Sequence, residues 1–294
     1  MNRQLLQRDE LRRRITSDLL LRLPLLLAFA LASGACGTIQ PPETGGPRAN
    51  QPVYPVVLSE DPPRREASLA AARQLLTQQG AQNVEVKLQP VTATIQSLPA
   101  NQSVPLYLPK VGANPEMSEE ETRESLRRFI ESWRSLIGAE PSQLSLTEWQ
   151  NQPNTTKLAA YEQRPFRYTL RGDYGKLQIQ FAGDRRVLNV SSTCIPNTER
   201  LQNSLASITP VVKPEDAVKY VQENEITFID SGGRQQTMRL AANTKVDAGE
   251  LVYYVLPSAP DIIEFHLAWA VAVSDAPVKI VYLDAVSSKV IAAV

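Results

Sequence analysis

The stretch 251–294 constrains the fold of this chain most, because its apolar residues follow the two-residue period of β-strands. Between positions 266 and 273 large and small side chains alternate: Leu267, Trp269, Val271 and Val273 on one side, His266, Ala268, Ala270 and Ala272 on the other. A period of two places these sets on opposite faces of a pleated strand. We predict four strands here, with the large face against a core and a helix at 214–223 lying on the alanine face.

A capped helix followed by a run of strands precedes this stretch. Ser118 and Glu121 form an S-x-x-E capping box. The apolar stripe behind the box ends at Gly138: Leu126, Phe129, Ile130, Trp133, Leu136 and Ile137. Strands are predicted at 144–149, 157–161, 166–170, 176–181 and 186–192. A helix followed by a meander therefore occurs at 118–192 and again at 213–294, which predicts an α+β fold of tandem small units, each a helix packed on an antiparallel sheet.

Composition excludes several classes of function. The 31 basic and 31 acidic residues cancel, so nucleic acid is not an expected partner. One histidine cannot build a histidine metal site, and no phosphate-binding glycine loop, dinucleotide fingerprint or nucleophile elbow is present. We therefore expect no enzyme activity, no cofactor and no small-molecule substrate.

Two residues leave a chemical alternative open. His266 lies near Asp261 and Glu264, so a histidine–carboxylate site competes with a histidine that is hydrogen-bonded to backbone. Cys194 is interpreted as a small buried residue near a strand end, the alternative being a nucleophile.

Residues 1–36 form a targeting segment rather than part of the fold. An arginine-rich start precedes an apolar run at 23–32, which is too short for a transmembrane helix of ~20 residues. Small residues and then Cys36 follow. This arrangement resembles a bacterial lipoprotein signal, in which the cysteine is lipidated, although Ser33 stands where that family prefers leucine. The alternative is an ordinary secretory signal cleaved near Ala35.

Residues 37–65 are rich in proline and glycine and predict a disordered tether. The lipoprotein resemblance implies a membrane partner through lipid on Cys36 and an envelope location facing the periplasm. Gly37, rather than aspartate, follows the cysteine, and by resemblance to the sorting of such lipoproteins this implies the outer rather than the inner membrane.

Several motifs resemble the propeptide region of secreted zinc metalloproteases, a fungalysin/thermolysin propeptide-like part followed by a PepSY domain. They are the residues 128–138, 177–187, 194–196, 213–217, 251–254, 267–269, 281–285 and 289–291. The resemblance implies a propeptide-like domain at 116–208 and a PepSY-like domain at 209–294, and the apolar spacing before them predicts a small helix–strand segment at 66–112. Residues 170–175 depart from the family's Gly-Ile-Pro-Val loop, and Ser287-Ser288 replaces its Thr-Gly turn.

The zinc-binding H-E-x-x-H motif of such proteases does not occur in the sequence. The resemblance therefore implies a non-catalytic, membrane-anchored lipoprotein that binds, and inhibits or chaperones, a secreted peptidase or another exported protein in trans. Aromatic candidates for the contact surface are Tyr253, Tyr254, Trp269 and Tyr282, the alternative being that they belong to the core. A second hypothesis is a docking lipoprotein of an envelope assembly without a peptidase role, and a third is a hydrolase.

Overall fold

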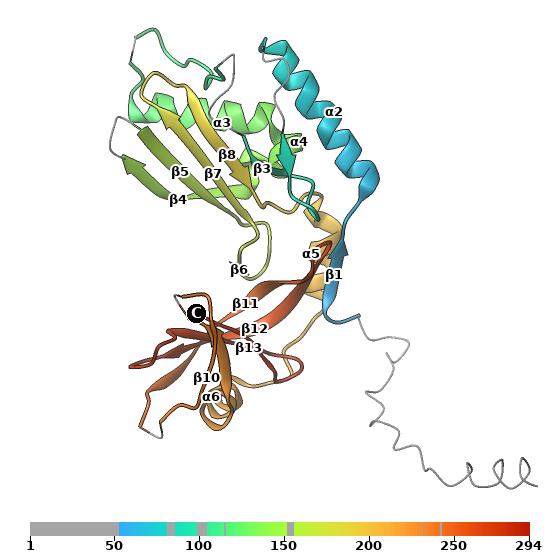
Figure 1. The fold of residues 1–294 in the computed structure, drawn as a ribbon, viewed down its shortest axis with the longest axis vertical. Coiled ribbons are helices and arrows are strands. Elements are labelled where there is room, and N and C mark those ends of the chain that lie inside the picture. The colour runs from blue at the N-terminus through green and yellow to red at the C-terminus, as the bar shows by residue number, and fades with distance from the viewer. Residues whose placement is uncertain are drawn as a thin grey trace, which may run out of the picture. The chain divides into compact units, whose positions relative to one another are not determined.

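Helices and antiparallel strands share this fold, which is mixed α+β (Figure 1). The computed structural model describes residues 53–80, 86–98, 105–114, 116–151, 156–230, 232–241 and 243–294. Five α-helices lie within these ranges. The targeting segment predicted at 1–36 and most of the predicted tether lie outside the described residues.

Helix α3 (Glu119–Ser132) begins at the predicted capping box. The Glu121 amide donates to Ser118 Oγ at 3.2 Å, and the Ser118 amide donates to Glu121 Oε2 at 2.7 Å. A break at Trp133 separates α3 from the short helix α4 (Arg134–Ile137), which ends at Gly138 with φ 82°. A side chain at position 138 would be strained by this φ, and its Cβ would lie 2.5 Å from Thr94 Cγ2.

A four-stranded antiparallel sheet in the order β4-β5-β7-β8 packs against these two helices (Figure 1). Its strands are β4 (Leu144–Asn151), β5 (Thr156–Gln163), β7 (Lys176–Ala182) and β8 (Val187–Ser192). The predicted apolar stripe is fully buried against Leu177, Ile179 and Phe181. The rings of Phe129 and Trp133 stack at 5.2 Å within this core.

Helix α2 (Pro62–Gln78) and the two short strands β2 (Lys87–Leu88) and β3 (Ile95–Ser97) join the same core. Ala72 and Leu76 are the buried apolar positions of α2. The Thr94 hydroxyl donates to the Ser192 carbonyl at 2.8 Å, which ties this segment to β8. A short 3-10 helix, η2 (Pro141–Gln143), leads into β4.

A second, six-stranded sheet has the order β14-β13-β12-β11-β6, with β1 as an additional partner of β12. Its strands are β1 (Val56–Ser59), β6 (Leu170–Gly172), β11 (Val246–Ala259), β12 (Ile262–Val273), β13 (Ile280–Asp284) and β14 (Val290–Ala293). The pairing of β6 with β11 is parallel, and the other pairings are antiparallel. At Gly172, φ is 96° and an added Cβ would lie 2.6 Å from the Val255 carbonyl oxygen, so glycine permits this close approach.

Two strands of this sheet differ from what the sequence predicts. The predicted tether 37–65 contains β1 and the start of α2, because Val56 and Leu58 alternate with exposed neighbours and pack into an apolar cluster. The strand predicted at 166–170 is reduced to β6, at Leu170–Gly172. The sheets therefore do not follow the predicted domain boundaries at 65 and 208.

The predicted position of the helix at 214–223 is also corrected. Helix α6 (Pro214–Glu223) packs Ala217 and Val221 with Val271 and Val273, on the large apolar face rather than the alanine face. The physical reason is that the small helix residues find more apolar contact on the large side chains. On the alanine face, the ring of Tyr254 lies 4.5 Å from that of Tyr282, above Ala268 and Val252.

Helix α5 (Thr198–Ala206) was not predicted from the sequence. The strands β9 (Ile226–Ile229) and β10 (Gln235–Met238) form an antiparallel hairpin after α6. Leu205 of α5 packs with Val255, Phe265 and Leu267 of the second sheet. In the part of the chain that the structure describes, no helix has the length and apolar character needed to span a membrane.

Candidate functional site

Strand β12 changes partners halfway along one of its edges. Its residues Ile262–Phe265 pair with β1, and Ala268–Ala272 pair with β13. His266 and Leu267 lie in the interval between these two partners. The Leu267 amide donates to the Tyr54 hydroxyl at 3.2 Å, and the Ala285 amide donates to the Leu267 carbonyl at 2.7 Å. The amide and the carbonyl of Leu267 are therefore both hydrogen-bonded, although neither β1 nor β13 pairs with β12 at this position.

A polar cluster fills this interval, and we call it the Tyr54–His266 cluster; its members are the buried His266 and Asp284 and the half-buried Tyr54 and Glu264. His266 Nδ1 lies 2.7 Å from Asp284 Oδ2, and His266 Nε2 lies 3.1 Å from Glu264 Oε2. The Tyr54 hydroxyl donates to the same Asp284 oxygen at 2.6 Å. The other Asp284 oxygen accepts the amides of Val286 and Ser287 at 2.9 and 2.7 Å.

The geometry of the cluster requires a charged histidine. Both ring nitrogens of His266 face carboxylate oxygens, which only accept hydrogen bonds when ionised, so both nitrogens must donate. Burial lowers the pKa of His266, but hydrogen bonds to Asp284 and Glu264 outweigh it and leave that pKa raised. Burial likewise raises the pKa of Asp284, and the donors from His266, Tyr54 and two amides bring it down to about 2.

The cluster attaches β1 to the sheet. His266 is 8% exposed and Asp284 1% exposed, and each is already hydrogen-bonded within the cluster. Burial and the bond to Asp284 raise the pKa of the Tyr54 hydroxyl. Burial also raises the pKa of the Cys194 thiol to about 12, so it is not a thiolate nucleophile at neutral pH. Among the described residues, no three His, Cys, Asp or Glu side chains are grouped as metal ligands.

Strand β1 has a second edge, which lines a groove. Among the described residues β1 pairs only with β12. The Glu60 amide donates to the Asp261 carbonyl at 2.9 Å, so by alternation the backbone groups of Val56 and Leu58 face β12, and those of Val57 and Ser59 face away. A cavity of about 620 Å³ is lined by all four residues of β1 and by Glu60, Asp61 and Pro62, and Leu201 and Ser204 of α5 line it as well.

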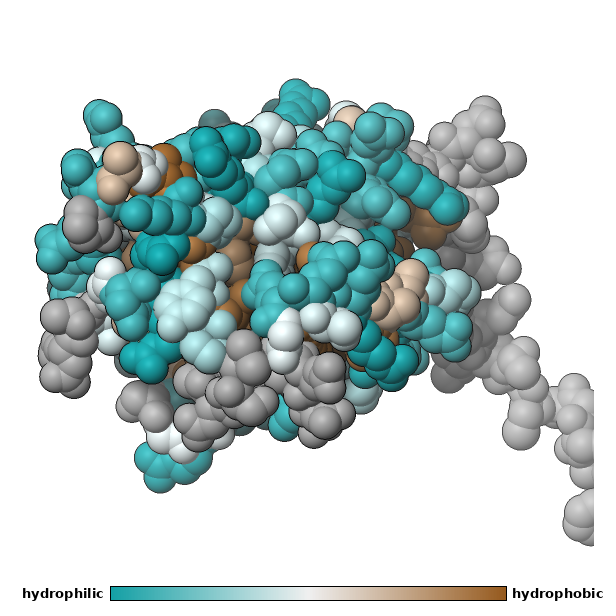
Figure 2. Space-filling view, turned by 90° about the horizontal axis from the view of Figure 1, so that it is seen from above, coloured by the Kyte–Doolittle hydropathy of each residue, from teal (hydrophilic) through white to brown (hydrophobic). Residues whose placement is uncertain are grey.

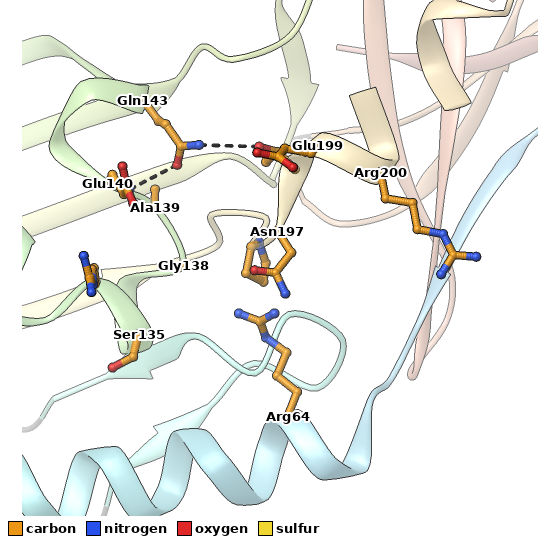
Figure 3. A pocket seen from close by; sticks show the side chains of 12 residues that line it. Arg64, Ser135, Gly138, Ala139, Glu140, Gln143, Asn197, Glu199 and Arg200 are labelled. Atoms are coloured by element: carbon orange, nitrogen blue, oxygen red, sulfur yellow. Dashed lines mark hydrogen bonds between the residues drawn. The ribbon is translucent and has the colours of Figure 1, made fainter. Parts of the chain in front are cut away.

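A second cavity of about 560 Å³ adjoins the groove, and Figure 3 shows its lining. The two cavities share Arg64, Pro196, Asn197 and Arg200. Gln143 closes one side by donating from Nε2 to Thr198 Oγ1 at 3.5 Å and accepting from the Glu140 amide at 3.1 Å. The Arg64 guanidinium points toward Asn197, whereas the Arg200 side chain extends away from it (Figure 3).

The local sequence explains why these residues meet at the cavity. Asp61 caps α2 by accepting from the Arg64 amide at 3.2 Å, and Pro62 and Pro63 occupy the first helical turn, so Arg64 lies close to the end of β1. Asn197 adopts a left-handed conformation with φ 52° and begins α5 without a side-chain cap. The Gln163 side chain exchanges two hydrogen bonds of 2.8 Å with the backbone of Ile195, which fixes the chain just before this turn.

The four predicted contact aromatics do not form one surface. Tyr253 is 1% exposed, lies between Phe166 and Tyr168, and donates to the Leu205 carbonyl at 3.3 Å. Trp269 donates to the Val212 carbonyl at 2.9 Å on the same face of the sheet. Tyr254 and Tyr282 form a pair on the opposite face, with Tyr282 buried. The predicted lipidation site, Cys36, lies outside the described residues.

Sequence reasoning found part of the histidine cluster and none of the groove. It paired His266 with Glu264, but it named Asp261 in place of Asp284 and did not involve Tyr54 at all. The signal for Asp284 was an aspartate at the end of a strand with a turn behind it, which is a common position for a carboxylate that caps backbone amides. The signal for α5 was the spacing of Leu201, Leu205 and Ile208, which recur with helical period.

Comparison with known proteins gives no family for this chain: no family model matches it. No curated protein matches it either.

The face of the molecule seen in Figure 2 is largely hydrophilic, and its hydrophobic side chains lie in small recesses between polar ones. The groove beside β1, the adjoining cavity and the Tyr54–His266 cluster are therefore the features from which a function is inferred.

Proposed function

We propose that this protein is a non-catalytic, lipid-anchored envelope protein that binds an extended segment of an exported protein along the outer edge of β1. The partner class follows the resemblance to metalloprotease propeptides and PepSY domains, so the first partner to test is a secreted peptidase, which the protein inhibits or chaperones. The single observation that supports binding at this place is the groove of about 620 Å³ that β1 and α5 line, next to a strand whose one partner among the described residues is β12.

The groove suits an extended chain for physical reasons. A strand of four residues is about 13 Å long at a rise of ~3.3 Å per residue, and the groove follows β1 over its whole length. An incoming strand gains backbone hydrogen bonds from Val57 and Ser59, and side-chain contacts give specificity. The Tyr54–His266 cluster supports this use because it holds β1 on its inner edge.

The envelope location is a separate part of the proposal and has its own experiment. Lipid on Cys36, followed by a proline-rich segment, would hold the groove away from an outer membrane on its periplasmic side. Cells grown with an alkyne analogue of palmitate should label the protein, and Cys36→Ser should abolish the label. A protein that stays labelled in this variant, or is never labelled, contradicts the lipid anchor and favours a cleaved secretory signal.

Crosslinking in cells tests the binding function. A photoreactive residue at Val57, which is 52% exposed on β1, should capture an exported protein, and the same residue at Ile229, 72% exposed on β9, should not. Ser59→Pro removes an outward amide and blocks one backbone bond to the partner, so it should reduce capture from position 57. Equal capture from both positions, or capture unchanged by Ser59→Pro, contradicts binding at the edge of β1.

The identity of the captured partner and its activity distinguish an inhibitor from a docking protein. If it is a peptidase, its hydrolysis of a fluorogenic peptide should fall when the purified wild-type protein is added, and less so with Ser59→Pro. A chaperone role predicts a higher yield of folded peptidase without this inhibition. A stable envelope protein as the partner, with no effect on any peptidase, supports the docking alternative instead.

A further inference from the structure

Arg64 is a partly desolvated cation at the point where the groove and the adjoining cavity meet. Its side chain is half-buried, and burial lowers the pKa of its guanidinium. The ion pairs of the described residues do not include Arg64. Nearby Asp61 caps α2 by accepting from the Arg64 amide, and its charge also acts on the guanidinium and opposes the effect of burial on the pKa of Arg64. The terminal nitrogens of Arg64 therefore retain capacity for a carboxylate.

Buried neighbours hold the Arg64 side chain in position. Its Nε donates to the Thr92 carbonyl at 3.2 Å. The Thr92 and Thr94 hydroxyls are hydrogen-bonded at 2.7 Å, and Thr94 is bonded in turn to Ser192 of β8. Both threonines are buried. A guanidinium fixed through Nε presents its two terminal nitrogens in a planar fork, which matches the two oxygens of a carboxylate.

The other charged residues around this cavity do not duplicate Arg64. Arg134 pairs with Glu131 at 3.2 Å, and Arg200 is exposed and extends away from Arg64 (Figure 3). The carboxylates of Glu140 and Glu199 lie on the Gln143 side of the cavity in the same view. Arg65, the next residue of α2, pairs with Glu60 at 3.6 Å, and Glu60 and Asp61 line the same end of the groove. Arg64 is thus the half-buried arginine that lines both cavities and has no ion pair among the described residues.

We propose that Arg64 binds an acidic side chain of the segment that lies along β1, so that the partner sequence is an extended, alternating segment with an Asp or Glu at the end nearest α2. This inference rests on the proposed function, because it takes the β1 groove as the place where the segment binds. It adds the chemistry of one side chain of the partner. The backbone of the segment pairs with β1, and its carboxylate replaces water around the Arg64 fork.

Selection from random peptides tests both statements in one experiment. A phage-displayed library of random dodecamers is panned on the purified full-length protein in detergent, and in parallel on the variants Ser59→Pro and Arg64→Gln. The wild type should enrich alternating sequences with an acidic residue at one fixed position. A selected peptide should bind roughly tenfold or more tightly than its Asp-to-Asn or Glu-to-Gln version, and Arg64→Gln should reduce this ratio to about one.

Matched variants keep the result interpretable. Arg73→Gln removes an exposed charge on the same helix and should leave the acidic preference unchanged. Arg64→Lys keeps the charge without the fork and should keep a reduced preference, which supplies a second measurement if Arg64→Gln folds poorly. Selected peptides should also bind more weakly to Ser59→Pro, whatever their charge.

The outcomes separate the two proposals. If no sequence is enriched, or if binding is unaffected by Ser59→Pro, the β1 groove is not a peptide site and both proposals are overturned. If alternating peptides are enriched without an acidic position, or if the acidic preference survives in Arg64→Gln, the role of Arg64 is overturned and the groove remains.

Discussion

The two sheets of this protein are built in different ways. In the four-stranded sheet β4-β5-β7-β8, the strands pair in their order along the chain, and an apolar core with a stacked Phe129–Trp133 pair holds α3 against it. The six-stranded sheet takes β1 and β6 from distant parts of the chain, and its junction with β1 is closed by the polar Tyr54–His266 cluster. Apolar packing stabilises the first sheet broadly, whereas the second depends at this junction on charge and hydrogen-bond geometry.

The largest effect is expected from breaking the apolar core of the first sheet. Phe129 is 1% exposed, so Phe129→Ala should lower the free energy of unfolding by about 3–5 kcal/mol through lost burial and a cavity. Urea unfolding at neutral pH measures this change. Glu120→Gln on the exposed first turn of the same helix should stay within ~0.5 kcal/mol. A loss below 1 kcal/mol for Phe129→Ala would mean that this core is not the main support of the first sheet.

Removing one charge of the cluster should have the next largest effect, and it acts on the second sheet. Asp284→Asn leaves the His266 imidazolium buried with Glu264 as its remaining partner, and we expect a loss of about 3 kcal/mol at pH 6. Hydrogen exchange should locate the loss in β1 and β12 rather than in β7 and β8. Asp247→Asn, an exposed carboxylate of β11, is the matched control and should cost about 0.5 kcal/mol or less.

The pH dependence of stability should reveal the charges of the Tyr54–His266 cluster without any mutation. The pKa of Asp284 is lowered to about 2, so its contribution of about 2 kcal/mol is complete above its unfolded pKa of ~4 and is lost as the pH falls toward 2. The pKa of His266 is raised, so its contribution is complete below its unfolded pKa of ~6.5 and is lost as the pH rises through the folded pKa.

Urea midpoints measured from pH 2 to pH 9 should therefore be highest between about pH 4 and pH 6.5. His266→Gln should remove the decrease on the alkaline side, and Asp284→Asn should weaken the decrease on the acid side. A wild-type curve that keeps rising from pH 6 to pH 9 would contradict a charged His266 in the folded protein.

The smallest change tests the attachment of β1 alone. Tyr54→Phe removes a hydroxyl that donates to Asp284 and accepts from the Leu267 amide, while the ring can stay at 5.9 Å from His266. We expect a loss of about 1–1.5 kcal/mol and faster hydrogen exchange in β1. Tyr107→Phe, an exposed tyrosine, should change neither quantity measurably. Unchanged exchange in β1 would show that Tyr54 does not hold this strand.

Sequence reasoning succeeded where the contacts are local. The capping box at Ser118, the stripe from Leu126 to Ile137 and the stop at Gly138 are all in place, because each depends on residues within a few positions of one another. The alternation at 176–192 likewise gave β7 and β8, which are neighbours in both sequence and space.

Sequence reasoning failed where a contact joins distant positions. A strand of four residues such as β1 is a weak local pattern, and its partner β12 is specified by packing that no short window contains. The partner of His266 was missed because Asp284 comes from the next strand and Tyr54 lies 230 positions before Asp284. The alanine face was assigned to the wrong element because a period of two separates the faces of a strand without saying which face a helix will cover.

The pairing of β1 with β12 also sets the order in which the protein can be completed during synthesis. Chains emerge from the ribosome amino end first, so all strands of the four-stranded sheet are available before β12 exists. Strand β1 is made before any of them, yet its partner and the His266–Asp284 pair come almost last. For most of that time both edges of β1 are open, and its shortness and flanking prolines, Pro55 and Pro62, then limit pairing with other chains. The strand that starts the described chain is therefore among the last to find its place.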